Sequence, residues 1–365
     1  MPSYFNLVVF AAKQRPSVFV VCSIPPKPVY LASVDTLPYG LLRSCCYSEL
    51  DSLSLSMVAF RALRSSKLIS WKPTGRLQQT LAGCVERRGN TLHSGKASVV
   101  KLGPGFVGEG RYFDFRSNSI PASIDFAHQS PLCTTLCKDG FRVRTVEHLL
   151  SALEATGVDN CRIEIENVDS GGDCAEIPIF DGSASEWVAA VEEVGLKVAT
   201  DHHGNSCEKL APHLNEPMYV FRNDSFVAAF PSTMVQITYG INFPQASAIG
   251  LQWFSTPLDK LLYSKQIALS RTFCIHEEIE QMRNAGLIKG GSLENAIVCS
   301  AHNGWLNPPL RFDDEPCRHK VLDLIGDLSL FAQFGNQGVP VAHVVAYKAG
   351  HALHADLVRR LMGTI

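Results

Sequence analysis

After residue 75, hydrophobic and polar positions alternate along several short segments rich in β-branched and aromatic residues. This pattern predicts half-buried β-strands. The segments in the first half are Leu77–Val85, Ser98–Leu102, Arg111–Phe115 and Cys161–Glu166. Apolar residues three and four positions apart predict two helices, over Arg144–Thr156, with Thr145 as a plausible N-cap, and over Ser185–Val194.

The second half repeats this alternation of short strands and helices. Predicted strands are Met218–Phe221, Ser225–Phe230, Met234–Ile241 and Ala296–Cys299. Predicted helices are His276–Ala285, Pro316–Phe334 and Ala352–Met362. A polar stretch at 201–207 separates the halves, so we expect α+β domains over 75–200 and 206–365, with layers packed as a sandwich rather than one doubly wound sheet.

Residues 1–74 differ from the rest of the chain. Only three acidic residues precede Glu86, whereas Ser, Arg and Lys are frequent, which is typical of an organelle transit peptide. Over Met57–Trp71 the residues Phe60, Leu63, Leu68 and Trp71 would share one helical face. We therefore expect a targeting leader, mitochondrial rather than plastid, with Met57 as a hypothetical true start. The alternative is a disordered tail.

Composition narrows the function classes. The chain has 365 residues, of which 46% are hydrophobic, enough for two ordinary domains. Its 33 Lys and Arg against 35 Asp and Glu argue against a nucleic-acid-binding protein. No apolar run reaches the roughly 18–20 residues of a membrane-spanning helix. The twelve cysteines lack the paired spacing of a disulfide framework or a structural zinc site.

The segment 311–327 holds the clearest candidate chemistry. His319, Asp323 and Asp327 are spaced i, i+4 and i+8, so they form a row along one edge of the predicted helix. An imidazole and a carboxylate on consecutive turns can bind one divalent metal ion. The alternative is a surface ion pair or a capping role, which this spacing also allows.

Two further segments offer groups that move protons. Glu147 and His148 are adjacent at the start of a predicted helix, so one could hold a metal while the other accepts a proton. A capping glutamate beside a core histidine is an equally good interpretation. His351 follows Gly350 at the start of the last predicted helix and could act as a general acid, or simply lie on the surface.

Taken together, these segments resemble one family, the UDP-3-O-acyl-N-acetylglucosamine deacetylases, which are zinc amidases of lipid A biosynthesis. The resemblance runs from about Gln79 to the C-terminus in several ordered motifs. They are Leu92–Gly95, Thr145–Leu149, Glu176–Ala184, Ser270–Phe273, Gly290–Val298, Arg311–Asp327 and Gly350–Leu353. The resemblance implies two similar two-layer α/β sandwich domains packed together, with the active site between them.

The resemblance also implies a cofactor and a reaction. Zn²⁺ would be held by His148, His319 and Asp323, with one position left for water. Glu147 would be the general base and His351 the general acid. The reaction would remove the N-acetyl group of UDP-3-O-acyl-N-acetylglucosamine as acetate, an early committed step of lipid A biosynthesis.

Supporting groups follow from the same resemblance. Thr272 resembles the residue that stabilises the oxyanion together with the metal. Lys320 and Asp327 resemble supporting residues, and Asp327 would orient His351. We expect a monomer whose partner is a small-molecule substrate, with neither nucleic acid nor a membrane span.

The substrate's acyl chain would lie in an apolar passage formed by an insert at about 273–298. Candidate contacts there are Phe273, Ile279, Leu287, Ile288 and Leu293, and ordinary core packing is an equal alternative for each wall residue. The uridine end resembles the surroundings of Phe243 and Asn242, where many relatives have Asp in place of Asn242. Pro316 and Cys317 also depart from the family pattern.

Two alternatives to this function stay open. One is a zinc amidase of the same fold that acts on another N-acylated sugar. The other is a non-enzymatic binding protein that kept the fold, which is disfavoured because every matched ligand and proton-transfer position is filled.

Overall fold

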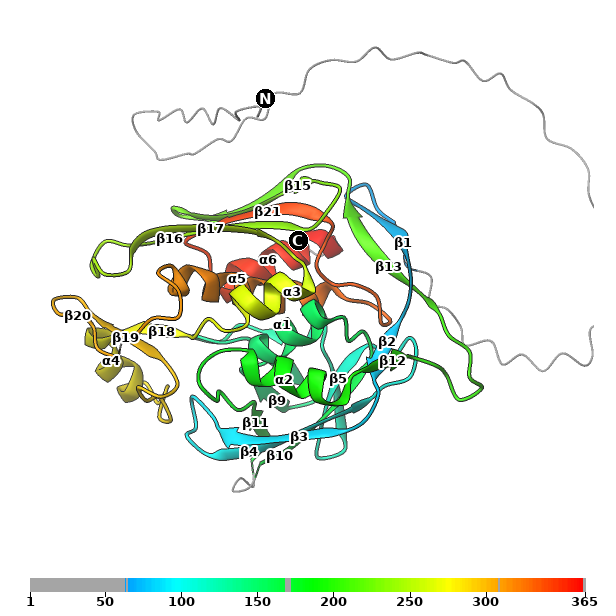
Figure 1. Ribbon diagram of the computed structural model, residues 1–365, viewed down its shortest axis with the longest axis horizontal. Coiled ribbons are helices and arrows are strands. Elements are labelled where there is room, and N and C mark those ends of the chain that lie inside the picture. Colours follow the sequence, from blue (N-terminus) through cyan, green and yellow to red (C-terminus); the bar gives the residue numbers. More distant parts are fainter. Residues whose placement is uncertain (1–62, 64, 168–171, 308, 364–365) are drawn as a thin grey trace, which may run out of the picture. The chain divides into compact units, whose positions relative to one another are not determined.

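The computed structural model describes residues 63, 65–167, 172–307 and 309–363. The first half of this part builds a five-stranded sheet (Figure 1). Its strands, in spatial order, are β3 (Val85–Asn90), β4 (Ala97–Pro104), β10 (Cys161–Asn167), β5 (Arg111–Phe115) and β6 (Asn118–Pro121). The pair β10–β5 is parallel and the other pairs are antiparallel.

The second half builds a sheet with the same connectivity. Its strands, in spatial order, are β14 (Met218–Arg222), β15 (Ser225–Pro231), β21 (Ala342–Tyr347), β16 (Gln236–Phe243) and β17 (Gly250–Pro257). Only the pair β21–β16 is parallel, at the position that β10–β5 holds in the first sheet. The two halves are therefore repeats of one topology.

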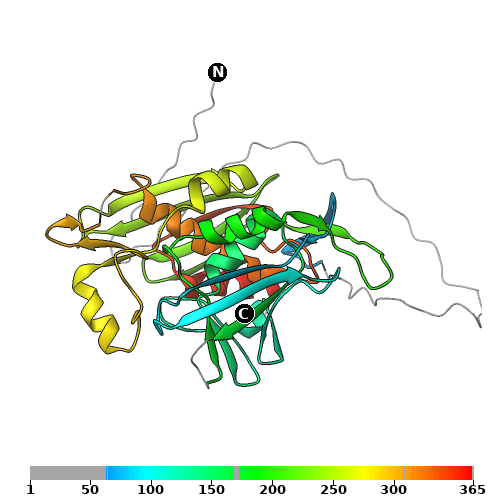
Figure 2. The same ribbon diagram turned by 60° about the horizontal axis from the view of Figure 1, so that its bottom comes forward.

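Each repeat also has two helices in matching places. In the chain, one helix precedes the central strand of the sheet, β10 or β21, and the other follows it. In the first half these are α1 (Glu147–Thr156) and α2 (Ser185–Val194), and in the second α5 (Glu315–Leu328) and α6 (His351–Met362). The helices lie between the two sheets (Figures 1 and 2). This confirms the predicted α+β fold of two similar sandwiches.

The closest crossing between the halves is that of α1 and α5. Gly326 of α5 lies against the start of α1, where an added Cβ would come within 2.1 Å of the Glu147 carbonyl oxygen. Leucines of α1 and aliphatic residues of α5 around this crossing are fully buried, and they are Leu149, Leu150, Leu153, Val321, Leu322 and Ile325. Apolar burial on both sides thus holds the two helices at a distance that only glycine permits.

Each half carries an insert, most of which lies between the fourth strand of its sheet and the helix α1 or α5. The first is a sheet of β11 (Cys174–Glu176), β9 (Phe141–Arg144), β8 (Thr135–Lys138) and β7 (Ala127–His128). The second consists of β18 (Phe273–Ile275), α4 (Ile279–Asn284), β19 (Ile297–Ser300) and β20 (Gly304–Trp305). It covers the stretch where an insert was expected and continues to Trp305.

Short strands precede and join the halves. β1 (Ile69–Leu77) pairs with β13 (Glu208–Leu214), and β2 (Gln79–Leu81) pairs with β12 (Leu196–Val198). Residue 75 falls within β1, so the expected boundary at that residue was too late. Trp71 also falls within β1, so the helix expected over Met57–Trp71 does not reach it. The leader up to residue 62, including Met57, lies outside the described residues. The described residues belong to one compact unit.

Other boundaries differ for local reasons. The strand predicted over 77–85 is interrupted after Leu81, and α1 begins at Glu147 without a side-chain cap. Thr145 takes a left-handed φ of 59° and donates from its hydroxyl to Glu176 instead. α5 ends at Leu328 and continues as a 3₁₀ turn. No helix among the described residues is long and apolar enough to cross a membrane.

Candidate active site

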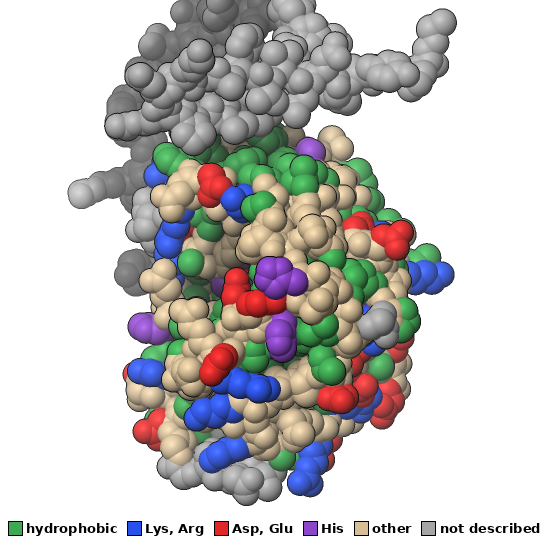
Figure 3. Space-filling model, turned by 90° about the vertical axis from the view of Figure 1, so that its left-hand side faces the viewer, with side chains coloured by type: hydrophobic (Ala, Val, Ile, Leu, Met, Phe, Trp, Pro, Cys, Tyr) green, Lys and Arg blue, Asp and Glu red, His purple; other side chains and the backbone are tan. Residues whose placement is uncertain are grey.

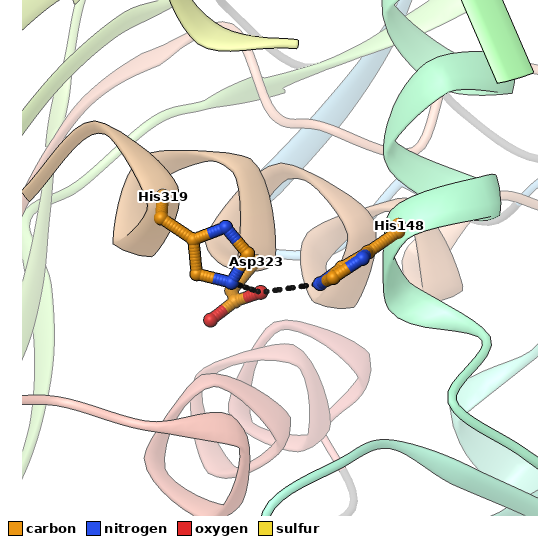
Figure 4. A group of neighbouring side chains, drawn as sticks. All are labelled: His148, His319 and Asp323. Carbon is orange, nitrogen blue, oxygen red and sulfur yellow. Dashed lines mark ion pairs between the residues drawn. The ribbon is translucent and has the colours of Figure 1, made fainter. Parts of the chain in front are cut away.

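The crossing of α1 and α5 brings two histidines and an aspartate together (Figure 4). His148 lies in the first turn of α1, while His319 and Asp323 lie on consecutive turns of α5. Asp323 Oδ1 is 3.5 Å from His148 Nε2 and 3.4 Å from His319 Nε2. All three side chains are buried.

This donor set fits a tetrahedral metal ion. Nitrogen and oxygen ligands about 2.0–2.1 Å from zinc stand about 3.3–3.4 Å from one another in a tetrahedron, close to the two distances above. His319 donates from Nδ1 to the Ser270 carbonyl oxygen over 3.0 Å, which leaves the Nε2 lone pair free. Lys320 donates to Asp323 Oδ2 over 2.8 Å, which leaves Oδ1 for an ion.

The charge states of these groups also suit a metal. Burial lowers the pKa of His319 to about 4, so its imidazole is neutral near pH 7. Burial alone would raise the pKa of Asp323, but Lys320 and His319 outweigh it and hold the pKa well below its usual range. A neutral imidazole and an ionised carboxylate are the forms that bind zinc.

Glu147 and His351 face each other beside this cluster. His351 Nε2 lies 3.9 Å from Glu147 Oε1, and Glu147 Oε2 accepts from the Thr134 backbone N–H over 3.0 Å. Burial raises the pKa of Glu147 to about 7, although His351 opposes this shift. A carboxylate with this pKa can both accept and release a proton near neutral pH.

Asp327, one turn beyond Asp323, binds the ring nitrogen of His351 that faces away from Glu147. Its Oδ2 accepts from His351 Nδ1 over 2.8 Å and from His354 Nδ1 over 2.7 Å, while the Thr134 hydroxyl donates to Oδ1. These are hydrogen-bond lengths and leave no room for an ion between the atoms. Burial would lower the pKa of His351, but Asp327 and Glu147 outweigh it and raise the pKa to about 10.

A cavity of about 780 Å³ opens beside these groups, and Thr272, Lys320 and His351 are among its lining residues. Thr272 is placed by its backbone N–H, which donates to the Gly182 carbonyl oxygen. Gly182 has a φ of 88°, and a Cβ there would come 2.2 Å from the Asn295 carbonyl oxygen. On the face that carries the second insert, histidine and acidic side chains gather near the centre (Figure 3).

The sequence matches a known family over most of its length. Residues 78–363 match the LpxC family, described as UDP-3-O-acyl N-acetylglycosamine deacetylase. The chain belongs to this family. The matched region contains every element of both repeats, together with the whole cluster around α1 and α5.

Individual relatives of the LpxC family are similar over nearly their full length. The probable UDP-3-O-acyl-N-acetylglucosamine deacetylase 1, mitochondrial, of Arabidopsis thaliana is 63% identical over 305 residues, which are 83% of this chain and 94% of that one. The UDP-3-O-acyl-N-acetylglucosamine deacetylase of Trichormus variabilis is 45% identical over 294 residues, which are 78% of this chain and 98% of that one.

The expected substrate contacts divide into two groups. Phe273, Ile279 and Leu293 line the cavity. Ile288 also lines the cavity, but its neighbour Leu287 is not among the described residues that do. Phe243 and Asn242 do not line it either.

Of these two residues, Phe243 lies directly behind the cavity wall. The ring of Phe243 packs edge-on against Phe273 at 5.5 Å between centroids. The Asn242 side-chain amide donates to the Tyr347 hydroxyl over 3.4 Å.

Three contributors to the site were missed by sequence reasoning. Thr134 contacts both Glu147 and Asp327, yet it lies in an irregular stretch without periodicity. Ser270 contributes only a backbone carbonyl, which no side-chain pattern can reveal. His354 offered one signal, its i, i+3 spacing from His351 on a predicted helix.

Proposed function

We propose that this protein is a zinc-dependent deacetylase of UDP-3-O-acyl-N-acetylglucosamine. Water would cleave the amide bond, releasing acetate and leaving UDP-3-O-acyl-glucosamine, a step of lipid A biosynthesis. Membership of the LpxC family supports the reaction class. The observation that carries the proposal is the convergence of His148, His319 and Asp323 next to the facing pair Glu147 and His351.

His148, His319 and Asp323 would hold the metal through Nε2, Nε2 and Oδ1. When bound, zinc would lower the pKa of a water molecule to about 7 and polarise the amide carbonyl. The atoms of these side chains that would not bind the metal make hydrogen bonds that support this assignment. Ser270 fixes the tautomer of His319, and Lys320 fixes the Asp323 carboxylate.

Glu147 would accept the proton of the attacking water. Its carboxylate is buried and its pKa of about 7 places it where a general base is effective at neutral pH. The Thr134 N–H fixes Oε2, so Oε1 is the oxygen that faces His351 and the reacting atoms. This assigns acceptance of the proton to Oε1.

His351 would donate a proton to the leaving amine. An amine leaves readily only when it is protonated, and a raised pKa of about 10 keeps His351 protonated near pH 7. Asp327 binds Nδ1, so the proton on Nε2 is the one available for transfer. Glu147 as base and His351 as acid, 3.9 Å apart, could serve opposite sides of one amide.

Thr272 and Lys320 would surround the acetyl carbonyl. Both line the cavity beside His351. As the carbonyl becomes tetrahedral its oxygen gains negative charge, which the Thr272 hydroxyl can stabilise as a hydrogen-bond donor. Lys320 already donates to the Asp323 carboxylate, and its positive charge would also stabilise the developing oxyanion.

The rest of the substrate would occupy the cavity and its rim. Phe273, Ile279, Ile288 and Leu293 supply an apolar wall in the second insert for an acyl chain. We also propose that the nucleotide lies towards Phe243 and Asn242, as the family resemblance implies.

The protein would act in mitochondria. Five Arabidopsis thaliana relatives, each 63% identical, carry the word mitochondrial in their names. The acid-poor leader that precedes the described residues is consistent with such targeting. We propose that the protein functions there as a monomer.

Acetate release from UDP-3-O-acyl-N-acetylglucosamine tests this function. We expect release that stops when a chelator removes the metal and returns when zinc is added back. UDP-N-acetylglucosamine without the acyl chain serves as the matched substrate and should react much more slowly. Equal turnover of both substrates, or release that is unaffected by the chelator, would contradict the proposal.

A further inference from the structure

His354 is buried behind the proposed general acid. It lies one turn after His351 on α6 and is 0% exposed. The rings of the two histidines are 6.1 Å apart and nearly perpendicular. A fully buried imidazole needs partners for both nitrogens, and the identity of these partners indicates what the residue does.

Both nitrogens of His354 have one partner each. Nδ1 lies 2.7 Å from Asp327 Oδ2, and Nε2 lies 3.0 Å from the Tyr239 hydroxyl. Asp327 has a pKa of about 2: burial would raise it, but His351 and His354 outweigh burial. An ionised carboxylate only accepts hydrogen bonds, so Nδ1 of His354 is the donor.

Asp327 therefore receives three donors, two of them on one oxygen. His351 and His354 share Oδ2, and the Thr134 hydroxyl occupies Oδ1. With His351 alone on Oδ2, the Thr134 hydroxyl would be the other contact that opposes rotation of the carboxylate about its terminal torsion, which is intrinsically broad. The second imidazole, rigidly packed in the core, restricts that rotation.

Tyr239 extends this arrangement to the backbone that carries His351. Its hydroxyl lies 2.8 Å from the Ala349 carbonyl oxygen, two residues before His351, and its single proton is shared between that oxygen and Nε2 of His354. The Tyr239 side chain is buried on β16. The sheet, the start of α6 and the end of α5 are thus connected through His354.

We propose that His354 is a positioning residue that holds the Asp327 carboxylate in the orientation that presents Nε2 of His351 to the substrate. The inference rests on the proposed function, in which His351 is the general acid. It assigns the effect to the Nδ1 contact with Asp327, whereas a merely structural role would depend on filling the space around both nitrogens.

Two substitutions separate these roles. In His354→Asn the amide nitrogen can replace Nδ1 as donor to Asp327, but nothing reaches Tyr239. In His354→Gln the longer side chain places its amide near the position of Nε2 and loses the contact with Asp327. Both variants keep a polar side chain of intermediate size, so they control for each other in stability.

The experiment compares the full-length, zinc-loaded parent and both variants in acetate release, zinc content and melting temperature. We expect kcat of His354→Gln to fall roughly 10–100-fold with KM little changed, as for other contacts behind a site. His354→Asn should keep most of its activity. Equal losses in the two variants, or no loss in His354→Gln, would overturn the proposal.

A second readout does not depend on turnover. In protein labelled with ¹⁵N-histidine, the His351 Nδ1 proton bound to Asp327 should give a far-downfield NMR signal. We expect this signal in the parent and in His354→Asn, and its loss or shift in His354→Gln. If the parent releases no acetate, the proposed function fails, while an unchanged signal in His354→Gln would refute the positioning role separately.

Discussion

Replacing Gly326 with alanine isolates the contribution of the α1–α5 crossing. The added Cβ would come 2.1 Å from the Glu147 carbonyl oxygen, whereas ordinary contacts of such a carbon begin at 3.4 Å, which is 1.3 Å farther away. The obstacle is backbone, so it cannot rotate aside. The two helices must therefore separate by more than about 1 Å, or α5 must bend.

The consequence for the site follows from where its residues lie. His148 and Glu147 belong to α1, while His319 and Asp323 belong to α5, so separation of the helices would stretch the proposed metal site and displace the proposed base. A misplacement of about 1 Å can cost about 100-fold in rate. We expect a loss of that order in kcat/KM for Gly326→Ala, together with weaker zinc binding.

The change in folding stability of Gly326→Ala gives an independent test of the same reasoning. By helix propensity alone, Gly→Ala inside a helix stabilises by about 0.5–1 kcal/mol. Overpacking costs about 1–3 kcal/mol, so we expect net destabilisation instead. Zinc content, acetate release and thermal unfolding would be compared with those of Gly172→Ala, where a Cβ meets nothing within 4 Å. A Gly326→Ala protein that is more stable than the parent and fully loaded with zinc would refute this reasoning.

Three further substitutions probe individual roles. His319→Ala should lose zinc and activity together, as measured by metal analysis, and normal zinc content would exclude it as a ligand. Glu147→Ala should keep zinc but lose most turnover, and retained turnover would exclude it as the base. Thr134→Val removes the hydroxyl donor to Asp327 but keeps the N–H bond to Glu147. We expect kcat to fall roughly 10–100-fold at unchanged zinc content, and Thr134→Ser should restore it.

Helix periodicity predicted the part of the site that lies on one element. The i, i+4 spacing of His319 and Asp323 indicated that both could reach one ion, and both lie on consecutive turns of α5 as expected. Their meeting with His148 could not be derived from spacing, because it depends on how two distant helices cross. The family resemblance supplied that pairing, and Gly326 explains physically why the approach is possible.

Other features were not predicted from the sequence because they depend on tertiary contacts. β21 (Ala342–Tyr347) is the central strand of the second sheet but was not predicted, because its residues alternate in burial and not in polarity. β1 was assigned to the leader because composition, not pairing, was the available signal, and its partner β13 lies more than a hundred residues away. Thr134 became visible as a site residue only when the structure placed it between Glu147 and Asp327.

X-ray absorption at the zinc edge of the purified protein would test the central claim most directly, because nitrogen and oxygen ligands differ from sulfur in distance. We predict one zinc per chain with a first shell of nitrogen and oxygen at about 2.0–2.2 Å, including the scattering pattern of two imidazoles. A shell containing sulfur at about 2.3 Å would instead assign the metal to cysteines. That result, or the absence of bound zinc, would contradict the account.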